Sequence, residues 1–470
     1  MKPTSHAFKE NARAALGDVN LQKAMTNLRA GFVERRALMI SRLPEWDGLR
    51  DEAVAIKRHT LANLDFYLES FERNVIANGG KVHWCRDAAE ANATVLAICR
   101  DLGAKTVTKG KSMIGEEMAV NEYLELNGMI PVETDLGEYI IQIRHEGPSH
   151  IIAPAIHLVK EQIAESFRAT HTKLDPKRPL DDARQMCDEA RGILRQQFLA
   201  ADVGITGANF LIAETGSSII VTNEGNGDLT QTLPRAHIVL ASLEKIVPTL
   251  EDAATILRLL ARSATGQEFS SYTTVSTGPR RPSDIDGPGQ YHVVLLDNGR
   301  SAMLGTEFED MLRCIRCAAC LNHCPVYEAV GGKSYGWVYP GPMGSVLTPT
   351  LVGIEEAGNL PNASTFCGRC ESVCPMRIPL PKMMRHWRER EFSRHLSPAS
   401  WRWGLAFWTF FATRPRLYHA ASGAAARMLG FFGKRRGRFR SLPLASGWTG
   451  SRDMPAPQGR SFHSLWKSRS

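Results

Sequence analysis

Apolar residues recur at helical spacing along the first part of the chain. Leu61, Leu64, Leu68 and Phe71 lie three or four positions apart, and mostly polar residues fill the positions between them. This period matches an α-helix that buries one face. The pattern therefore predicts that residues 1–75 form a mostly helical N-terminal segment.

Between residues 76 and 300, short apolar runs of strand length alternate with longer stretches of helical period. Helices are expected over 88–102 and 113–127. Strands are expected at 81–85, 105–109, 151–154, 210–213, 219–222, 237–240 and 292–296. Alternating strands and helices are typical of an α/β fold, because parallel strands need crossover connections. We expect this range to form one α/β domain with a largely parallel sheet.

Residues 301–395 have a different character, because they contain most of the cysteines. This range is expected to be a separate, α-helical domain. Its middle segment, 331–350, is dense in glycine and proline, which predicts an ordered loop or a partner surface without regular structure. A charged stretch over 382–395 predicts a helix that leads out of the domain.

The net charge of +8 comes from the end of the chain. Residues 401–470 carry thirteen Lys or Arg and one acidic residue, Asp453, and this end, which we bound as segment 396–470, is also rich in aromatic residues. Such a tail can lie on an anionic membrane surface, or it can pack on the preceding domain or on a partner subunit. Nothing else in the sequence supports nucleic-acid binding.

No apolar run reaches the roughly 20 residues that a membrane-spanning helix needs, and no secretory signal is seen at the N-terminus. We therefore expect a cytoplasmic protein. Peripheral contact with the inner face of the membrane, through the tail, is the alternative.

Seven of the ten cysteines fall in two runs. The first run is Cys314-Ile-Arg-Cys317-Ala-Ala-Cys320-Leu-Asn-His-Cys324-Pro325, and the second is Cys367-Gly-Arg-Cys370-Glu-Ser-Val-Cys374-Pro375. The first run has the full C-x2-C-x2-C-x3-C-P spacing of bacterial ferredoxins, and the second lacks only the first cysteine. Thiolates are the soft ligands that iron–sulfur clusters select. The repeated run predicts two clusters and the transfer of single electrons.

In two-cluster ferredoxins the last cysteine of each run binds the other cluster. Applied here, cluster one is held by Cys314, Cys317, Cys320 and Cys374, and cluster two by Cys324, Cys367 and Cys370. The missing fourth ligand of cluster two would stand at Ser364. That cluster is then either a 3Fe-4S cluster or a 4Fe-4S cluster with Ser364 or a small molecule as the fourth ligand. Structural zinc, or clusters with a structural or sensing role, are the alternatives.

Two glycine-rich turns follow apolar strands in the α/β range. They carry Glu214 and Thr215 in one turn, and Asn223 and Glu224 in the other. Turns at strand ends often line a crevice, which would make these residues a pocket for a small anion or acid metabolite. Alternatively, they are tight turns that need glycine and asparagine for positive φ. Gly110-Lys111-Ser112 lacks the first glycine of a phosphate loop, and the sequence identifies no catalytic residue.

Together these features resemble the lactate utilisation protein B family. The resemblance is carried by residues 212–216 and 223–226, by both cysteine runs, and by Tyr339-Pro-Gly-Pro342. It implies a LUD-type α/β domain of the sugar-isomerase/CoA-transferase-like fold, followed by a ferredoxin-like 4Fe-4S domain. It also implies oxidation of L-lactate to pyruvate together with two partner proteins, in which this chain is the electron carrier.

Two alternatives to the electron-carrier hypothesis stay open. In the first, the LUD domain itself converts the substrate and the clusters are its electron outlet. In the second, the same machinery serves a different 2-hydroxy acid.

Overall fold

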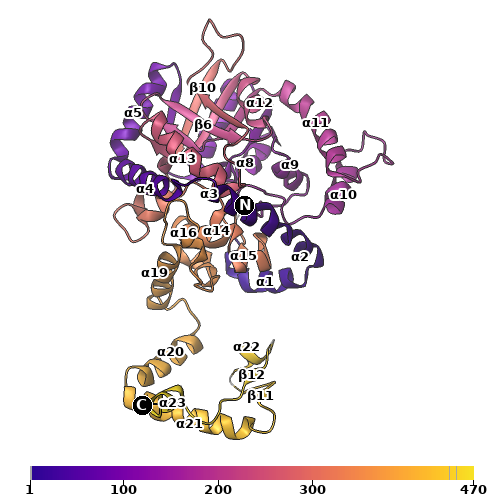
Figure 1. Ribbon diagram of the computed structural model, residues 1–470. Coiled ribbons are helices and arrows are strands. Elements are labelled where there is room, and N and C mark those ends of the chain that lie inside the picture. Colours follow the sequence, from indigo (N-terminus) through magenta and orange to yellow (C-terminus); the bar gives the residue numbers. More distant parts are fainter. Residues whose placement is uncertain (1–2, 444, 451, 470) are drawn as a thin grey trace. The chain divides into compact units, whose positions relative to one another are not determined.

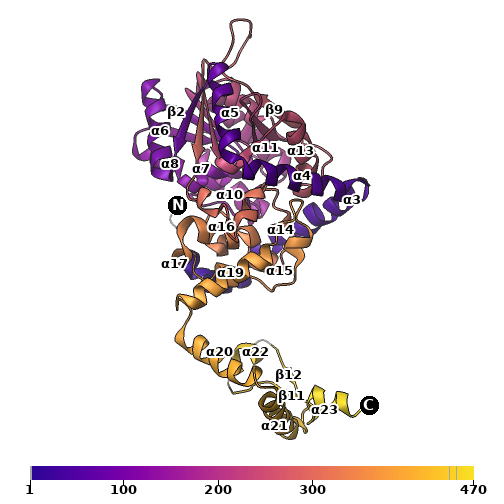
Figure 2. The same ribbon diagram turned by 90° about the vertical axis from the view of Figure 1, so that its left-hand side faces the viewer.

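The computed structural model describes residues 3–443, 445–450 and 452–469. The chain forms two compact units, residues 1–389 and residues 390–470. Figures 1 and 2 show their elements in two orientations. The first unit contains both the α/β range and the cysteine-containing range. Buried side chains from both ranges belong to one hydrophobic core, which includes Ile256 and Cys317.

A six-stranded sheet lies at the centre of the first unit. Its strand order is β1 (Lys81–Cys85), β10 (Gln290–Leu296), β7 (Ala236–Ser242), β4 (Val203–Gly207), β2 (Thr106–Gly110) and β3 (Ile130–Glu133). Every neighbouring pair is parallel. All seven residues of β7 are buried, as expected when both faces of a parallel sheet are covered. The predicted parallel α/β architecture is confirmed.

Helices cover both faces of this sheet, because successive side chains of a strand point to opposite sides. Ile238 and Leu240 pack with α6 (Ala88–Asp101), α7 (Met113–Met118) and α8 (Val120–Leu126). Val239 and Ala241 pack with α5 (Leu64–Ala77) on the other face. The predicted helix over 113–127 is divided into α7 and α8 at Ala119, whose φ is 55°.

A second, four-stranded sheet belongs to the same unit. Its order is β8 (Ile246–Val247), β5 (Phe210–Ile212), β6 (Ser217–Thr222) and β9 (Tyr272–Ser276). Near it lie α12 (Asn226–Thr232), the 3-10 helix η3 (Leu243–Lys245) and α13 (Leu250–Ala264). The helices α9 (Leu136–Ile143), α10 (Lys160–Thr170) and α11 (Ala183–Ala200) form a smaller apolar cluster of their own.

The N-terminal segment is helical, as its apolar spacing predicts. It consists of η1 (Ser5–Ala7), α1 (Phe8–Gly17), α2 (Val19–Met25), η2 (Arg29–Glu34), α3 (Arg35–Ser41) and α4 (Trp46–Ala62), before α5. Its first helices lie on the cysteine-containing range, and Figure 1 shows α1 and α2 beside α15. The Phe8 and Tyr335 rings are 5.2 Å apart, and the Gln22 side chain donates a hydrogen bond to the Ala329 carbonyl at 2.9 Å.

The cysteine-containing range is built from short helices. These are η4 (Ser301–Met303), η5 (Glu309–Arg313), α14 (Ala319–Asn322), α15 (Pro325–Val330), η6 (Lys333–Tyr335), α16 (Gly341–Val352), α17 (Ile354–Ala357), η7 (Leu360–Asn362), α18 (Arg369–Ser372) and α19 (Leu380–Ser393). The helix expected over 382–395 corresponds to α19.

Two sequence-based predictions are wrong. Residues 341–352 form α16 and are not a loop, because burial of nearly all their side chains outweighs their glycine and proline content. Pro342 lies in the first turn, where its missing N–H costs no helical hydrogen bond. Residues 151–154 form a bend that leads into a turn, and not a strand. Their backbone turns around His150, whose Nδ1 accepts hydrogen bonds from the Ile152 and Ala153 amides at 3.2 and 3.1 Å.

The second unit contains α20 (Ala399–Ala412), α21 (Pro415–Gly433), β11 (Arg438–Phe439), α22 (Ser446–Thr449), β12 (Met454–Pro455) and α23 (Phe462–Lys467). Helix α20 leaves large aromatic side chains exposed, including Trp403 at 76% and Phe407 at 70%. Across the part of the chain that the structure describes, no helix is both long and apolar enough to cross a membrane.

Candidate iron–sulfur sites and an adjoining cavity

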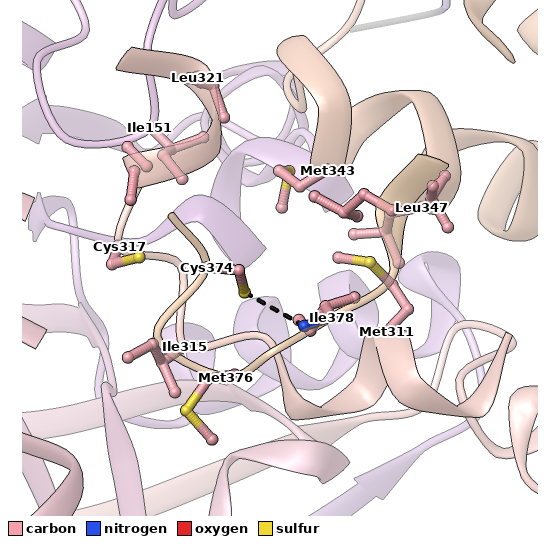
Figure 3. Close-up of a cluster of buried hydrophobic side chains, with 14 of the residues drawn as sticks. Ile151, Met311, Ile315, Cys317, Leu321, Met343, Leu347, Cys374, Met376 and Ile378 are labelled. Carbon is pink, nitrogen blue, oxygen red and sulfur yellow. Dashed lines mark hydrogen bonds between the residues drawn. The ribbon is translucent and has the colours of Figure 1, made fainter. Parts of the chain in front are cut away.

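Four cysteines from the two runs line one small cavity. Cys314, Cys317 and Cys320 come from the first run, and Cys374 comes from the end of the second. The rest of the lining is almost entirely apolar. Figure 3 shows Cys317 and Cys374 within a shell that includes Ile151, Met343 and Ile378. The set of four is the one that the ferredoxin spacing predicts for cluster one.

The backbone around Cys317 adopts an uncommon conformation that wraps the first run. Arg316 and Ala318, on either side of Cys317, have φ values of 59° and 60°, in the left-handed region. Ala318 is the N-cap of the four-residue helix α14, which carries Cys320. The two left-handed residues turn the chain sharply, so that cysteines with two residues between them can face the same cavity.

The second run repeats this conformation fifty residues later. Phe366 and Gly368 have φ values of 55° and 79°, and Gly368 is the N-cap of the four-residue helix α18, which carries Cys370. Each element of the first run therefore has a counterpart in the second. The counterpart of Cys314 is Ser364, whose hydroxyl oxygen accepts a hydrogen bond from the Phe366 amide at 3.1 Å.

The remaining three cysteines also influence one another. The charges of Cys324 and Cys367 both raise the pKa of Cys370, although burial is the larger cause and takes this pKa to about 12. Cys367 is exposed, and the backbone amide of Arg369 lowers its pKa. Cys324 and Cys367 therefore both lie within electrostatic range of Cys370.

The donor set fits iron–sulfur clusters. Burial raises the pKa of Cys317 to about 12 and of Cys374 to about 11. These thiols therefore lose their protons only when a strongly binding metal centre takes up the thiolate sulfurs. The Ile378 amide donates to the Cys374 sulfur at 3.4 Å, as in the hydrogen-bonded sulfurs that tune cluster potentials. Among the described residues, no three His, Cys, Asp or Glu side chains converge closely enough to hold a single metal ion.

Arginines from the N-terminal helices bind the backbone at the end of the second run. Arg36 donates to the Val373 carbonyl and Arg50 to the Cys374 carbonyl, each at 2.7 Å. Both arginines are buried at about 8–9% exposure. Their positive charges also lie near the sulfurs, which offsets the negative charge of thiolate ligands.

A second cavity, of about 200 Å³, lies at the carboxyl ends of the parallel strands. Lys111 follows β2, Asp135 follows β3, Gly207 ends β4 and Lys245 follows β7, and all four line it. In the sheet, β2 lies between β3 and β4, so the chain adds β3 on one side of β2 and then returns to add β4 on the other side. The strand order therefore reverses at β2. Ligands of open α/β sheets bind at such reversal points. Ile151 and Arg316 line both this cavity and the four-cysteine cavity.

The structure divides the four pocket residues suggested by the sequence. Asn223 and Glu224 line the second cavity, but Glu214 and Thr215 do not. The Glu214 carboxylate accepts from the Leu250 amide at 2.8 Å, at the start of α13, and the Thr215 hydroxyl donates to Ser217 Oγ at 2.8 Å. Both are exposed turn residues with local structural roles.

Charged residues that the sequence did not single out line the same cavity. Lys111 forms ion pairs with Asp135 and with Glu224, the latter at 3.1 Å. Lys245 is buried, and burial, followed by the charge of Arg316, lowers its pKa to about 8. The sequence offers only a weak indication that these residues line a site. Lys245 comes shortly after the apolar run 237–240, and Arg316 lies between two predicted cluster ligands.

Comparison with protein families assigns each part of the chain. Residues 68–296 match the LUD domain, residues 310–378 match the 4Fe-4S dicluster domain, and residues 371–470 match the C-terminal region of lactate utilisation protein B. With the two cysteine groups, these matches define an iron–sulfur protein built on a LUD-type α/β domain.

Relatives that match over the full length of the chain identify its family. Proteins named lactate utilization protein B from Macrococcus caseolyticus and Geobacillus thermodenitrificans are 42% and 43% identical, over 100% of this chain and 98% of their own. The chain belongs to the lactate utilization protein B family. The crystal structure of a DUF162 family protein from Deinococcus radiodurans covers 50% of this chain and 98% of its own, at 18% identity and a TM-score of 0.25.

Proposed function

We propose that the protein is the iron–sulfur electron carrier in the oxidation of L-lactate to pyruvate, together with two partner proteins. The relatives' shared name and the match to a 4Fe-4S dicluster domain support this role. The observation that carries it is the cavity lined by thiols of both cysteine runs, an arrangement that suits interleaved clusters.

In this proposal Cys314, Cys317, Cys320 and Cys374 hold a 4Fe-4S cluster. Cys324, Cys367 and Cys370 hold the second cluster, which is a 3Fe-4S cluster or a 4Fe-4S cluster with Ser364 or a small molecule at its fourth iron. The clusters supply one-electron acceptance and release. The protein's own side chains have positional roles: Arg36 and Arg50 keep the second run in place, and the apolar lining excludes water from the first site.

The number of electrons removed from lactate decides which step belongs to this chain and which to a partner protein. Conversion of L-lactate to pyruvate removes two electrons and two protons, whereas each cluster takes one electron at a time. A partner protein therefore accepts the electron pair as a hydride equivalent and passes single electrons to this chain. The exposed aromatic and basic second unit is the proposed docking element, for a partner first and for the inner face of the cytoplasmic membrane second.

The domain assignment is part of the same proposal. It comprises an N-terminal helical segment (1–75), a LUD-type domain (76–300), a ferredoxin-like domain (301–395) and a C-terminal region (396–470). The finer assignment of the LUD-type domain to the sugar-isomerase/CoA-transferase-like folds is supported by its parallel sheet.

Stopped-flow spectroscopy tests the electron-carrier role. Anaerobically purified protein is mixed with L-lactate, alone and with the two partners, and bleaching of the cluster absorbance is followed. Bleaching only in the presence of the partners is the expected result. Rapid bleaching of the isolated chain would contradict it.

That contrary result would favour a second candidate function. In it, the cavity of the α/β domain itself oxidises lactate or another 2-hydroxy acid, with the clusters as electron outlet. The observation in its favour is the shared wall, because Ile151 and Arg316 line both cavities.

A further inference from the structure

We propose that the cavity at the carboxyl ends of the sheet strands is a binding site for a small carboxylate, held by Lys245 and Arg316 beside cluster one. The inference rests on the proposed function only for the kind of carboxylate, a 2-hydroxy or 2-oxo acid. The anion site itself is argued from the charges, burial and contacts of the side chains.

Lys245 is the first observation. The residue is 8% exposed, it lines the cavity, and the described part of the chain provides no hydrogen-bond or ion-pair partner for its Nζ. The neighbouring Lys57, which is also buried, donates to the backbone carbonyls of Glu244 and Ile246. A buried ammonium group without a partner is costly, so a site that keeps one is suited to an anionic ligand.

The surrounding charges leave this ammonium unbalanced. Glu117 pairs with Arg300 at 2.6 Å. Glu244 is shared between Arg300 at 3.3 Å and Arg316 at 3.4 Å. With Lys57, which interacts electrostatically with Glu244 and Lys245, four buried or nearly buried cations thus face two carboxylates. An anion placed in the cavity would reduce this excess of positive charge.

Arg316 offers a second donor to the same ligand. Its Nη1 is buried without a hydrogen-bond partner, while its Nη2 faces Glu244. The guanidinium is fixed over the Tyr339 ring, 4.8 Å from the centroid, and Tyr339 in turn donates to Glu117 at 2.6 Å. A fixed guanidinium N–H together with an ammonium group suits the two oxygens of a carboxylate.

The rest of the lining favours a small ligand with a second oxygen function. A volume of about 200 Å³ is below the usual range of nucleotide or drug-sized pockets. Glu138 also lines the cavity, and burial raises its pKa well above the usual value, which favours the protonated form. A protonated carboxyl group can donate to a neutral hydroxyl or keto oxygen, which a 2-hydroxy or 2-oxo acid provides.

A competing explanation is that Lys245 and Arg316 only offset the thiolate charges of cluster one, since the Cys314 charge also acts on Lys245. The experiment therefore measures binding and not turnover. Equilibrium dialysis of anaerobically purified, cluster-loaded full-length protein with radiolabelled pyruvate and L-lactate gives the affinity. Lactamide, the uncharged amide of lactate, serves as competitor.

We expect saturable binding that lactate competes and lactamide does not, and a Kd at least about tenfold weaker in Lys245→Met, from the loss of one charged contact. Lys105→Met is the matched control, because Lys105 is exposed and precedes β2, at the strand end opposite Lys111. The electron paramagnetic resonance spectrum of reduced cluster one should also change on addition of pyruvate to the wild-type protein, a readout that needs no variant.

No saturable binding by the wild-type protein, equal competition by lactamide, or equal weakening in Lys105→Met would overturn the site. The charge-offset explanation predicts a changed cluster spectrum in Lys245→Met without any carboxylate binding. Failure of the site leaves partner-dependent bleaching by lactate intact, whereas failure of the electron-carrier role leaves binding intact, so the two proposals can fail separately.

Discussion

At the scale of single residues, the two cysteine runs share left-handed conformations at equivalent positions, 316 with 366 and 318 with 368. A side chain with a Cβ adopts this conformation only where the surroundings enforce it. The shared conformation indicates that both runs are shaped to surround the same kind of cofactor. The second run keeps this geometry even though Ser364 replaces the first cysteine.

A Ser364→Cys substitution should therefore complete the second site. We expect conversion of the second cluster to a three-iron form by air or ferricyanide to become slower than in the wild-type protein, because a fourth thiolate would retain the labile iron. Electron paramagnetic resonance of the oxidised protein follows the conversion. Ser393→Cys, an exposed position outside the runs, is the control. Equal rates in all three proteins would contradict the ligand assignment.

Replacing Cys314 tests the first site. Cys314→Ser should remove roughly half of the bound iron and sulfide, because the ligands of the second cluster stay in place. Cys187→Ser, at an exposed position outside the runs, should retain the full content. Chemical iron and sulfide analysis of anaerobically purified protein gives the answer, and one equivalent of zinc without iron would reject the assignment.

His150 should make stability depend on pH. Burial lowers its pKa to about 4, and its neutral ring pairs with Asn322 at 2.9 Å. Its stabilising contribution is therefore complete above the unfolded pKa of about 6.5 and is lost as the pH falls towards 4. Between pH 7.5 and 5 the free energy of unfolding should fall by about 2 kcal/mol more in the wild-type protein than in His150→Gln. Urea unfolding of both proteins measures this difference, and identical pH dependence would refute it.

The sequence singled out the four cysteines that line one cavity, because ligand spacing is dictated by the cluster itself and varies little with the fold. The second cysteine group stays a prediction. The sequence did not predict Lys245 or the role of Arg316. Their importance arises from residues such as Glu117 and Arg300, which lie far away in sequence and meet them only after folding. Asn223 and Glu224 were predicted from their turn, which follows a strand, but so were Glu214 and Thr215, whose turn lies outside the cavity.

At the scale of elements, strands that are continuous apolar runs were predictable, whereas β3, β4 and β9 were not. β7 and β10 are continuous apolar runs because both of their faces are covered. β3 contains Pro131, which argues against a central strand, but β3 lies at the edge of its sheet, where proline is tolerated. β9 is also an edge strand and is largely exposed, so its residues lack a clear pattern.

Helix α16 gives the element-scale prediction. A Cβ at Gly344 would lie 1.6 Å from the Tyr339 carbonyl oxygen, so Gly344→Ala should displace the turn that carries Tyr339. We expect a loss of about 3 kcal/mol or more in the free energy of unfolding. Gly192→Ala, in the middle of α11 with open space around it, should instead stabilise by up to about 1 kcal/mol. Thermal unfolding of both variants measures this contrast, and a Gly344→Ala protein as stable as Gly192→Ala would contradict the packing.

At the scale of the whole molecule, the LUD-type range and the cysteine-containing range share one core, whereas residues 390–470 form a unit of their own. Sequence patterns indicated the composition of each range. They could not show the shared core, because apolar residues do not reveal which distant partners they will contact.

Deletion of residues 401–470 should leave both clusters intact, since all seven cysteines precede the deletion. Iron content and absorbance spectra of the truncated protein check this. In flotation with vesicles containing anionic lipid, salt-sensitive binding by the full chain and none by the truncated protein would favour membrane docking. Absence of flotation, with partner binding lost on truncation, would favour docking to a partner.

Because Arg316 lines both cavities, occupancy of the proposed carboxylate site and the charge of the proposed cluster one would depend on each other. An electron added to cluster one places negative charge beside the proposed carboxylate, so reduction should loosen the ligand, and the bound ligand must lower the midpoint potential by the same free energy. Couplings of this kind are typically about 1–3 kcal/mol. The site would then release its anion when cluster one is reduced and take it up again once the electron has left.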